Sequence, residues 1–254
     1  MADTGILDGT VAIVTGAARG LGRAIALDLA KAGADIGVGL RDVDNDGGLV
    51  EEIGAIGRRA IPLAMDVLDL DASRAAIDRV ARELGSVDIL VNNAGGGIMG
   101  DAIDLTEAEF DGVWELNTKS TFFLSQHAAK HMREGRGGAI VNVASQAGLV
   151  ALPGESAYCV SKAAVIHMTR TLAVEWGEYG IRVNAVAPTF IETDGTADAL
   201  SDPAFLADTI ERIAALHRIG KPTEVAGAVT FLASPTASLI TGQTLAIDGG
   251  WTAR

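Results

Sequence analysis

A tyrosine and a lysine four residues apart are the clearest candidates for chemistry in this chain of 254 residues. Tyr158 and Lys162 lie within 157–178, a segment of helical composition, so their spacing places both side chains on one helix face. A free tyrosine has a pKa of about 10, and we expect the Lys162 ammonium to stabilise the phenolate and lower the pKa of Tyr158. The pair could then exchange protons with an alcohol or carbonyl oxygen. Because the same spacing arises by chance in many helices, its surroundings must decide.

Three polar residues provide such surroundings. Ser145 follows an apolar strand, and its hydroxyl could hold a substrate oxygen. Asn93 follows another strand, while Asn117 lies in a predicted helix, where asparagine is a mediocre helix former. Open parallel sheets bind ligands at the carboxyl ends of their strands, and these residues fall at or beside such ends.

Short apolar strands alternate with helix-length segments along the chain. We expect a first helix over 20–32 and strands over 10–15, 35–40, 61–65, 87–92, 139–144, 181–186 and 244–247. This order predicts the α/β class: a doubly wound, Rossmann-type sheet of seven mainly parallel strands with helices on both faces. We expect 1–254 to form a single dinucleotide-binding and catalytic domain. A long interruption before the last helix and strand contains 189–216, which we expect to form a substrate loop or lid.

A glycine-rich loop joins the first strand to the first helix. Gly16, Gly20 and Gly22 follow a G-x-x-x-G-x-G spacing, and glycine makes up 31 of the 254 residues. Without Cβ atoms the backbone can bend and a pyrophosphate can approach the unpaired N–H groups of the helix N-terminus. An ordinary glycine-rich turn would look similar, but the position after the first strand favours nucleotide binding.

The end of the second strand bears on the choice of dinucleotide. An acid there would bind the ribose of NAD, whereas an arginine would pair with the 2′-phosphate of NADP. Leu40 stands where we expect the NAD-selecting acid, Arg41 follows it, and Arg19 in the glycine loop is a second cation. Asp42 weakens the contrast, and Arg41 could also be a solvated turn residue. The sequence therefore favours NADP over NAD.

Composition narrows the class of protein. The net charge of −13 disfavours binding to nucleic acid or to an anionic membrane surface. The opening MADTGILDGT does not resemble a secretory signal, no apolar stretch is long enough to span a membrane, and the single cysteine cannot form an intrachain disulfide. We therefore expect a soluble cytoplasmic protein.

Taken together, the motifs resemble the short-chain dehydrogenase/reductase family. The resemblance covers about 9–250 and rests on TGAARGLG at 15–22, Asp66-Val67, NNAG at 92–95, Asn117, Ser145, YCVSK at 158–162, Pro188 and Asp248-Gly249-Gly250. Each motif is weak alone, but their order and spacing make a chance match improbable.

The resemblance implies an NAD(P)-dependent oxidoreductase that interconverts a secondary alcohol and a ketone by hydride transfer. Tyr158 would be the proton donor in reduction and the base in oxidation, and Lys162 would lower its pKa and bind the nicotinamide ribose. Ser145 would orient the reacting oxygen, and Asn117 would hold a water in a proton relay. The implied cofactor contacts are Gly16, Arg19, Gly20, Leu21, Gly22, Arg41, Asp66, Val67, Asn93, Ala94, Gly95, Tyr158, Lys162, Pro188, Ile191 and Thr193.

Substrate identity is less constrained. We expect the pocket to include Gln146, Leu152, Glu155 and Phe190, and we favour a small polar polyol, sugar or sugar acid. An alternative is a 3-oxoacyl-(acyl-carrier-protein) reductase: Lys130 matches one basic position of those enzymes, but Val174 stands where a second arginine is expected, and the net charge disfavours an acidic carrier. An alternative of another class is a non-catalytic dinucleotide-sensing protein.

Two further expectations concern a metal and assembly. His127 and His131 are four apart on a predicted helix and could bind zinc, but neither an HExxH glutamate nor a third ligand is evident, so we expect no metal. Family members are commonly tetramers, and 157–178 carries apolar residues around much of its circumference, which predicts a homotetramer.

Overall fold

The computed structural model describes residues 5–253, and its centre is one seven-stranded sheet. All strand pairs are parallel, and the strand order is β3-β2-β1-β4-β5-β6-β7. The strands are β1 (Val11–Val14), β2 (Asp35–Leu40), β3 (Ala60–Ala64), β4 (Ile89–Asn92), β5 (Gly138–Val143), β6 (Ile181–Pro188) and β7 (Thr244–Ile247). The predicted fold class is confirmed. The strand order reverses between β1 and β4, which in doubly wound sheets marks the ligand-binding crevice.

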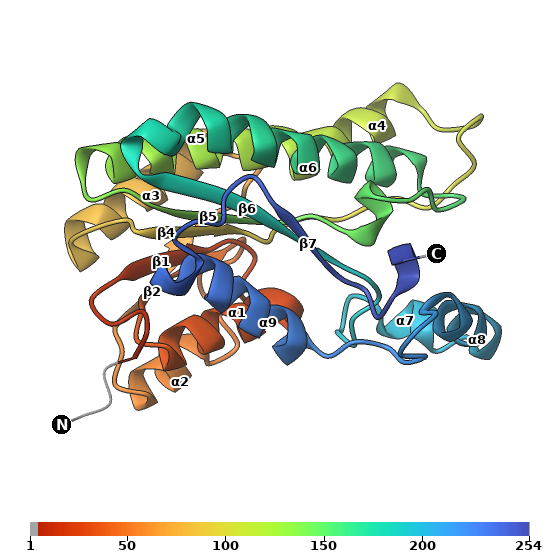
Figure 1. Cartoon of the computed structure of the whole chain (residues 1–254), viewed down its shortest axis with the longest axis horizontal. Helices are drawn as coiled ribbons and strands as arrows, with labels where there is room; N and C mark the ends of the chain where they lie inside the picture. The colour runs from red at the N-terminus through yellow and green to blue at the C-terminus, as the bar shows by residue number, and fades with distance from the viewer. Residues whose placement is uncertain (1–4, 254) are drawn as a thin grey trace.

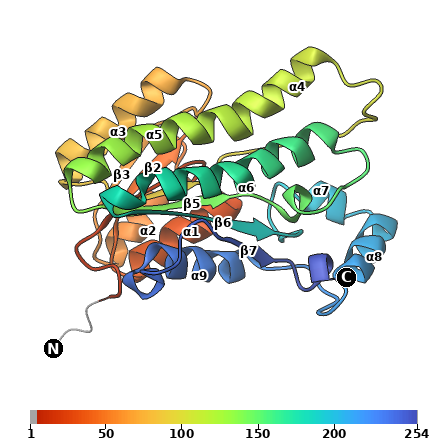
Figure 2. The same cartoon turned by 45° about the horizontal axis from the view of Figure 1, so that its top comes forward.

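Helices cover both faces of the sheet (Figures 1 and 2). One layer consists of α1 (Gly20–Lys31), α2 (Leu49–Ala55) and α9 (Pro222–Ala233). The other consists of α3 (Leu70–Leu84), α5 (Ser120–Glu134) and α6 (Ser156–Trp176). Helix α1 matches the prediction over 20–32 to within one residue, and α6 ends two residues before the predicted 178.

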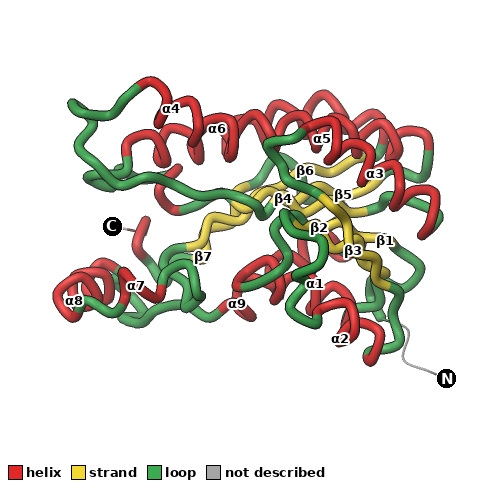
Figure 3. Tube along the Cα trace, turned by 180° about the vertical axis from the view of Figure 1, so that it is seen from behind, coloured by secondary structure: helices red, strands yellow, loops and turns green. Residues whose placement is uncertain are grey.

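The remaining helices extend the carboxyl side of the sheet. α4 (Glu107–Trp114) continues through a π-helical turn, η1 (Glu115–Lys119), into α5. The long connection after β6 contains α7 (Ala197–Leu200) and α8 (Pro203–Arg212), which lie outside the two helix layers (Figure 3). Short 3-10 turns complete the chain: η2 (Gln146–Gly148), η3 (Gly177–Tyr179), η4 (Pro235–Ala237) and η5 (Trp251–Ala253).

Two large hydrophobic cores and a small third one hold the layers to the sheet. Side chains alternate across a strand, and in β1 Ala12 and Val14 belong to the core under α1 and α9, whereas Val11 and Ile13 belong to the core under α3, α5 and α6. All four residues of β1 are buried, as expected for a strand covered on both faces.

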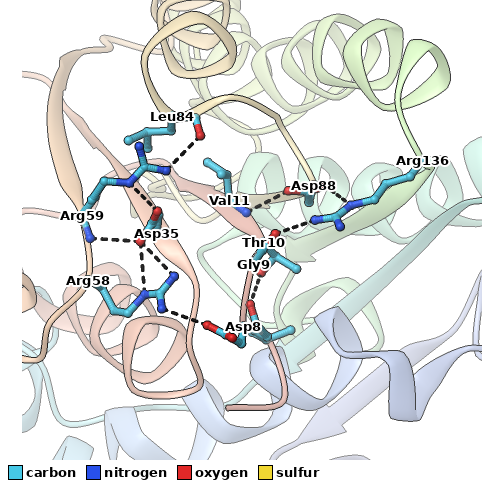
Figure 4. A network of polar contacts seen from close by, with 11 residues as sticks. Asp8, Gly9, Thr10, Val11, Asp35, Arg58, Arg59, Leu84, Asp88 and Arg136 are labelled. Atoms are coloured by element: carbon cyan, nitrogen blue, oxygen red, sulfur yellow. Dashed lines mark hydrogen bonds and ion pairs between the residues drawn. The ribbon is translucent and has the colours of Figure 1, made fainter. Parts of the chain in front are cut away.

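Paired charges close the amino end of the sheet (Figure 4). Asp35, the first residue of β2, accepts hydrogen bonds from the Arg58 Nε (3.1 Å), the Arg59 backbone N–H (3.0 Å) and the Arg59 Nε (2.7 Å). Asp88, just before β4, accepts from the Val11 N–H and from the Arg136 Nε, both at 2.9 Å. These contacts tie the starts of neighbouring strands together.

Candidate active site

A cavity of about 420 Å³ lies at the carboxyl ends of β4, β5 and β6. Most of its walls come from the segments that follow these three strands and from the start of α6. The lining residues are Leu21, Gly95, Gly96, Gly97, Ile98, Met99, Val143, Ala144, Ser145, Glu155, Tyr158, Pro188, Thr189, Ile191, Thr193, Gly195 and Thr196. Its size lies within the range of about 300–1,000 Å³ that is usual for small-molecule sites.

Ser145 and Tyr158 line this cavity, and Lys162 lies beside Tyr158. Ser145 follows β5, and its Oγ accepts a hydrogen bond from the Ala147 N–H (3.1 Å) and donates to the Gln146 Oε1 (3.0 Å). Tyr158 and Lys162 lie one turn apart on α6, with the Lys162 Nζ 5.6 Å from the centre of the Tyr158 ring. The Lys162 ammonium donates to the Val143 carbonyl oxygen at 2.8 Å, which fixes it at the end of β5.

Asn117 lies in the π-helical turn η1, where the backbone departs from regular α-helix. Such turns are rare in proteins overall, and those that occur are often found at functional sites. The Asn117 Nδ2 donates to the Gly96 carbonyl (2.8 Å) and to the Ser161 Oγ (2.9 Å), and its Oδ1 accepts from the Gly96 N–H (3.0 Å). The side chain therefore ties the loop after β4 to α6, directly beside Tyr158 and Lys162.

Burial dominates the protonation of Tyr158. Loss of hydration raises the pKa of Tyr158 to about 12, hydrogen bonding with Ser145 opposes this, and the charge of Glu155 adds to it. We expected Lys162 to lower the pKa of Tyr158 below its ordinary value of about 10. The structure contradicts that expectation. The reason is that the low-dielectric pocket penalises the phenolate, while the ammonium is engaged with the Val143 carbonyl.

Burial acts on Lys162 in the opposite sense. The residue is 4% exposed, and loss of hydration lowers the pKa of its ammonium to about 8. In both side chains burial therefore disfavours the charged form. At neutral pH Tyr158 carries its proton, and Lys162 titrates close to the working range of an enzyme.

The loop between β1 and α1 has the form of a phosphate cradle. Gly16 and Gly20 have φ angles of +64° and +55°, which favour glycine. A Cβ atom on Gly22 would overlap the Gly16 carbonyl oxygen and the Asn93 side chain. The helix N-cap, Arg19, makes no side-chain capping hydrogen bond, so the first N–H groups of α1 are available to an anion. These features fit a dinucleotide pyrophosphate.

Asn93 and Thr15 join the glycine loop to the loop after β4. The Asn93 Nδ2 donates to the Thr15 carbonyl (2.9 Å) and the Gly16 carbonyl (3.2 Å). The Thr15 Oγ1 accepts from the N–H groups of Asn93 and Ala94, both at 2.9 Å. A Cβ on Gly95 would lie 2.8 Å from the Asn117 Oδ1 and 3.2 Å from the Lys162 Nζ, so glycine here permits the close approach of these groups.

The other predicted cofactor residues lie around the same edge. Leu21, Pro188, Ile191 and Thr193 line the cavity. Arg19 and Arg41 are exposed, whereas Leu40, the last residue of β2, is only 1% exposed. Asp66 and Val67 follow β3, and the Asp66 Oδ1 accepts from the Leu68 N–H at 3.1 Å.

The predicted substrate residues take different places. Glu155 lines the cavity, and burial raises the pKa of its carboxyl group. Gln146, Leu152 and Phe190 are not among the lining residues. Gln146 is 3% exposed and bonded to Ser145, while Phe190 packs against Phe205 and Trp251, with ring centres 5.4 and 5.9 Å apart.

Sequence reasoning missed much of the cavity wall. Gly96, Gly97, Ile98 and Met99 line it from the loop after β4, and a Cβ on Gly97 would lie 3.0 Å from the Tyr158 ring. The signal was the glycine run that continues past Gly95 in the sequence.

The histidine pair has a neighbour that the sequence did not reveal. The Nε2 atoms of His127 and His131 both lie 2.7 Å from the Asp78 Oδ1, which comes from α3. The sequence shows no third potential ligand for this pair, and the structure supplies one from another helix.

Sheet, glycine cradle and tyrosine–lysine pair define the class of protein: an oxidoreductase that uses a dinucleotide cofactor. A family model described as "Enoyl-(Acyl carrier protein) reductase" matches residues 16–252. The chain belongs to the short-chain dehydrogenase/reductase family, as the motifs predict, and its members act on CH–OH groups.

Two curated relatives align over almost their whole length. The 2-dehydro-3-deoxy-D-gluconate 5-dehydrogenase of Escherichia coli is 42% identical over 249 residues, which cover 98% of this chain and 97% of that protein. The 3-oxoacyl-(acyl-carrier-protein) reductase of Thermotoga maritima is 40% identical, with 96% and 98% covered. A solved structure of a gluconate 5-dehydrogenase from Burkholderia cenocepacia, in complex with NADP and tartrate, has a TM-score of 0.93 and 33% identity, with 98% of this chain and 97% of that chain covered.

Among residues 5–253, no helix has the length and apolar character needed to cross a membrane.

Proposed function

We propose that this dehydrogenase interconverts a secondary alcohol and a ketone in a small polar polyol, sugar or sugar acid. One observation carries the proposal: Ser145, Tyr158 and Glu155 face a single small cavity beside the glycine cradle. Two of these groups can engage a reacting oxygen, and the third can accept hydrogen bonds from further hydroxyl groups of the same substrate.

Each catalytic residue has a distinct task in this mechanism. Tyr158, protonated at neutral pH, donates its proton to the carbonyl oxygen during reduction and takes one back during oxidation. Ser145 orients the reacting oxygen through its hydroxyl. Lys162, fixed by its hydrogen bond to the Val143 carbonyl one turn after Tyr158, would bind the nicotinamide ribose. Asn117 fixes the loop after β4 and belongs to the path by which protons return to Lys162. A dinucleotide held at the glycine loop of Gly16, Gly20 and Gly22 would supply or accept the hydride.

The proposal of a sugar-acid substrate rests on the cavity and on similar proteins. Glu155 places a half-buried carboxyl group among apolar walls, an arrangement that suits hydroxyl groups better than a long acyl chain. The relatives named as sugar-acid dehydrogenases support the same substrate class.

The carrier-protein reductase remains a second candidate because a relative with that name is 40% identical. Lys130 lies with Arg133 in a surface depression, but Val174, where the second arginine is expected, is 85% exposed and apolar. The net charge of −13 opposes docking of an acidic carrier. A non-catalytic sensor is disfavoured by the complete set of Asn117, Ser145, Tyr158 and Lys162.

A substrate panel tests the three functions together. Oxidation or reduction of the nicotinamide is followed by absorbance with NADP(H) and NAD(H) against polyols, sugar acids, keto sugar acids and oxoacyl thioesters. The highest kcat/KM with a sugar acid or polyol is the expected result. A preference for oxoacyl thioesters on a carrier protein would establish the alternative, and tight cofactor binding without turnover would establish the sensor.

We propose NADP as the preferred cofactor, held at its 2′-phosphate by Arg41 and Arg19. Both arginines are exposed at the edge of the cradle, and Leu40 leaves no carboxylate at the end of β2. Arg41→Ala should weaken NADPH binding by roughly tenfold or more and leave NADH binding nearly unchanged, measured by cofactor fluorescence titration. Equal losses for the two cofactors would contradict this assignment.

We propose that the single domain carries its substrate lid at 189–216. Ile191, Thr193, Gly195 and Thr196 line the cavity from this segment, and the Thr196 Oγ1 donates to the Ile191 carbonyl at 2.6 Å. Truncating α7 and α8 should raise KM for the substrate far more than the dissociation constant of the cofactor.

We propose a homotetramer. The strand β7 lies at the edge of the sheet and exposes Leu245 (41%). The preceding loop exposes Leu239 (97%), and α6 exposes Val174 (85%). A second copy of the chain could cover this edge and these apolar side chains. Light scattering at micromolar concentration should give four times the chain mass, and a monomer would contradict the proposal. A cytoplasmic location stays a prediction from the sequence, to be checked by cell fractionation.

A further inference from the structure

We infer that the protein binds a divalent transition-metal ion of the zinc type between α3 and α5, through Asp78, His127 and His131. The site lies outside the cavity described above. It uses side chains from two helices that lie side by side on one face of the sheet (Figures 1 and 2).

The three donor groups converge on one point. His127 and His131 are one helical turn apart on α5, so both rings project from the same face of that helix. Their Nε2 atoms each lie 2.7 Å from the same oxygen, Oδ1 of Asp78, and the ring centres are 5.6 Å apart. All three potential ligand atoms lie within 4.8 Å of one another.

This donor set has the chemistry of a zinc site. Imidazole nitrogen and carboxylate oxygen bind Zn²⁺ at about 2.0–2.2 Å, and three protein ligands leave a fourth position for water. Two neutral imidazoles can offer their Nε2 lone pairs to a cation at the same time, whereas in the absence of a metal both must present an N–H to one carboxylate oxygen. The Asp78 side chain is 48% exposed and can rotate outward to admit an ion.

The local charges are consistent with a carboxylate committed to the histidines. Arg74 and Arg82 flank Asp78 by one turn on either side of α3, at spacings that usually support ion pairs. Among the described residues, Arg74 pairs instead with Asp71 at 2.9 Å, and the ion pairs of Asp78 run to the two histidines. The histidines are 17% and 28% exposed, so the site is shielded but accessible from solvent.

The position indicates a structural role. His127 follows Asn117 by ten positions, which at a helical rise of 1.5 Å per residue is about 15 Å along the axis. A bound ion would therefore not touch the substrate, but it would fasten α3 to α5, the helix that follows the turn η1 with Asn117. Because the ion binds the folded chain, it should raise thermal stability.

Metal binding can be measured directly on tag-free protein. After equilibrium dialysis against micromolar Zn²⁺ at pH 7.5, elemental analysis should find one zinc per chain. At a free zinc concentration about 100 times its dissociation constant, the Tm should rise by roughly 5–10 °C. Lowering the pH to 5.5 should release the ion, because protonated imidazoles cannot bind it.

Variants separate this site from adventitious binding. His127→Asn/His131→Asn should lose the zinc and the Tm increase, whereas His167→Asn, on an exposed histidine of α6, should retain both. Asp78→Asn, which keeps the shape of the side chain, should weaken zinc binding by roughly tenfold or more even if the double variant fails to fold. The inference is overturned if the wild type takes up no stoichiometric zinc, or if Asp78→Asn and the histidine variant bind it as tightly as His167→Asn does. In either case the three side chains form an interhelical hydrogen-bonded cluster only.

Discussion

The two ends of the parallel sheet differ in how many hydrogen-bond partners surround their polar side chains. At the amino end, Asp35 and Asp88 are both 6% exposed, and each is surrounded by hydrogen-bond donors from arginine and backbone (Figure 4). At the carboxyl end, Tyr158 lines a cavity, and Lys162, which is 4% exposed, donates a hydrogen bond to the Val143 carbonyl. At the amino end, the carboxylates bond to groups of the protein itself. At the carboxyl end, polar side chains face a cavity where a ligand can bind.

The protonation of these groups reflects the difference. Burial acts to raise the pKa of Asp35, but hydrogen bonds from the Arg59 backbone and side chain and the charges of Arg58 and Arg59 outweigh it, and the pKa is lowered. For Tyr158 and Lys162 burial prevails. The amino end therefore stabilises charge, while the carboxyl end makes charge costly. Strongly perturbed pKa values of this kind cluster at functional sites.

The largest expected effect is on catalysis at the carboxyl end. Tyr158→Phe should lower kcat by about 100- to 10,000-fold because it removes the proton donor. Cofactor affinity should change little, since the ring remains. Stopped-flow or steady-state absorbance measures the rate, and fluorescence titration measures the affinity. Tyr179→Phe, on the other tyrosine of the chain, is the matched control and should be active. Turnover near normal in Tyr158→Phe would contradict the mechanism.

The next prediction concerns stability gained at the expense of turnover. Lys162→Met should abolish activity yet raise the free energy of unfolding at pH 7 by about 1–3 kcal/mol, because the buried ammonium is costly and Met fills its volume. The folded pKa of about 8 lies below the unfolded value of about 10.4. The wild type therefore pays this penalty below pH 8 and recovers from it as the pH rises towards 10.4.

Denaturant unfolding of both proteins checks the sign. The difference between Lys162→Met and wild type should shrink between pH 8 and pH 10 as Lys162 loses its proton in the folded state. A variant that is less stable than wild type at pH 7 would show that the hydrogen bond to the Val143 carbonyl outweighs the burial penalty.

The smallest of the three effects should appear at the amino end, in stability alone. Asp35→Asn should cost about 2 kcal/mol of unfolding free energy, the value of hydrogen bonds to a charged group, and leave kcat unchanged. Because the folded pKa of Asp35 is lowered, its contribution is present above the unfolded pKa of about 3.9 and disappears as the pH falls through the folded value. Chemical denaturation at pH 7 and pH 3 measures this. A loss of kcat without loss of stability would break the separation between the two ends.

Much of the fold was predictable because its signals are local. Strand ends agree with the structure to within two residues, since apolar runs and glycine turns are properties of short segments. The glycine cradle was also predictable, because Gly16 and Gly20 need φ values that few other residues adopt.

Other features were beyond the sequence because they depend on contacts between distant segments. The Asn117 side chain bonds to Gly96 and Ser161, which are far from it in the sequence. Asp78 meets His127 and His131 only because α3 packs on α5. The pKa of Tyr158 was predicted in the wrong direction, since spacing reveals a neighbouring lysine but not the degree of burial.

The sequence by itself determined the fold class and the family, because these depend on residue type, order and spacing. The tertiary structure alone decided the electrostatics. Whether a buried group is paired, as Asp35 is, or left facing a cavity, as Tyr158 is, depends on which segments the sheet brings together. Hydration and Coulomb energies depend on distance in space, and distance along the chain does not specify it.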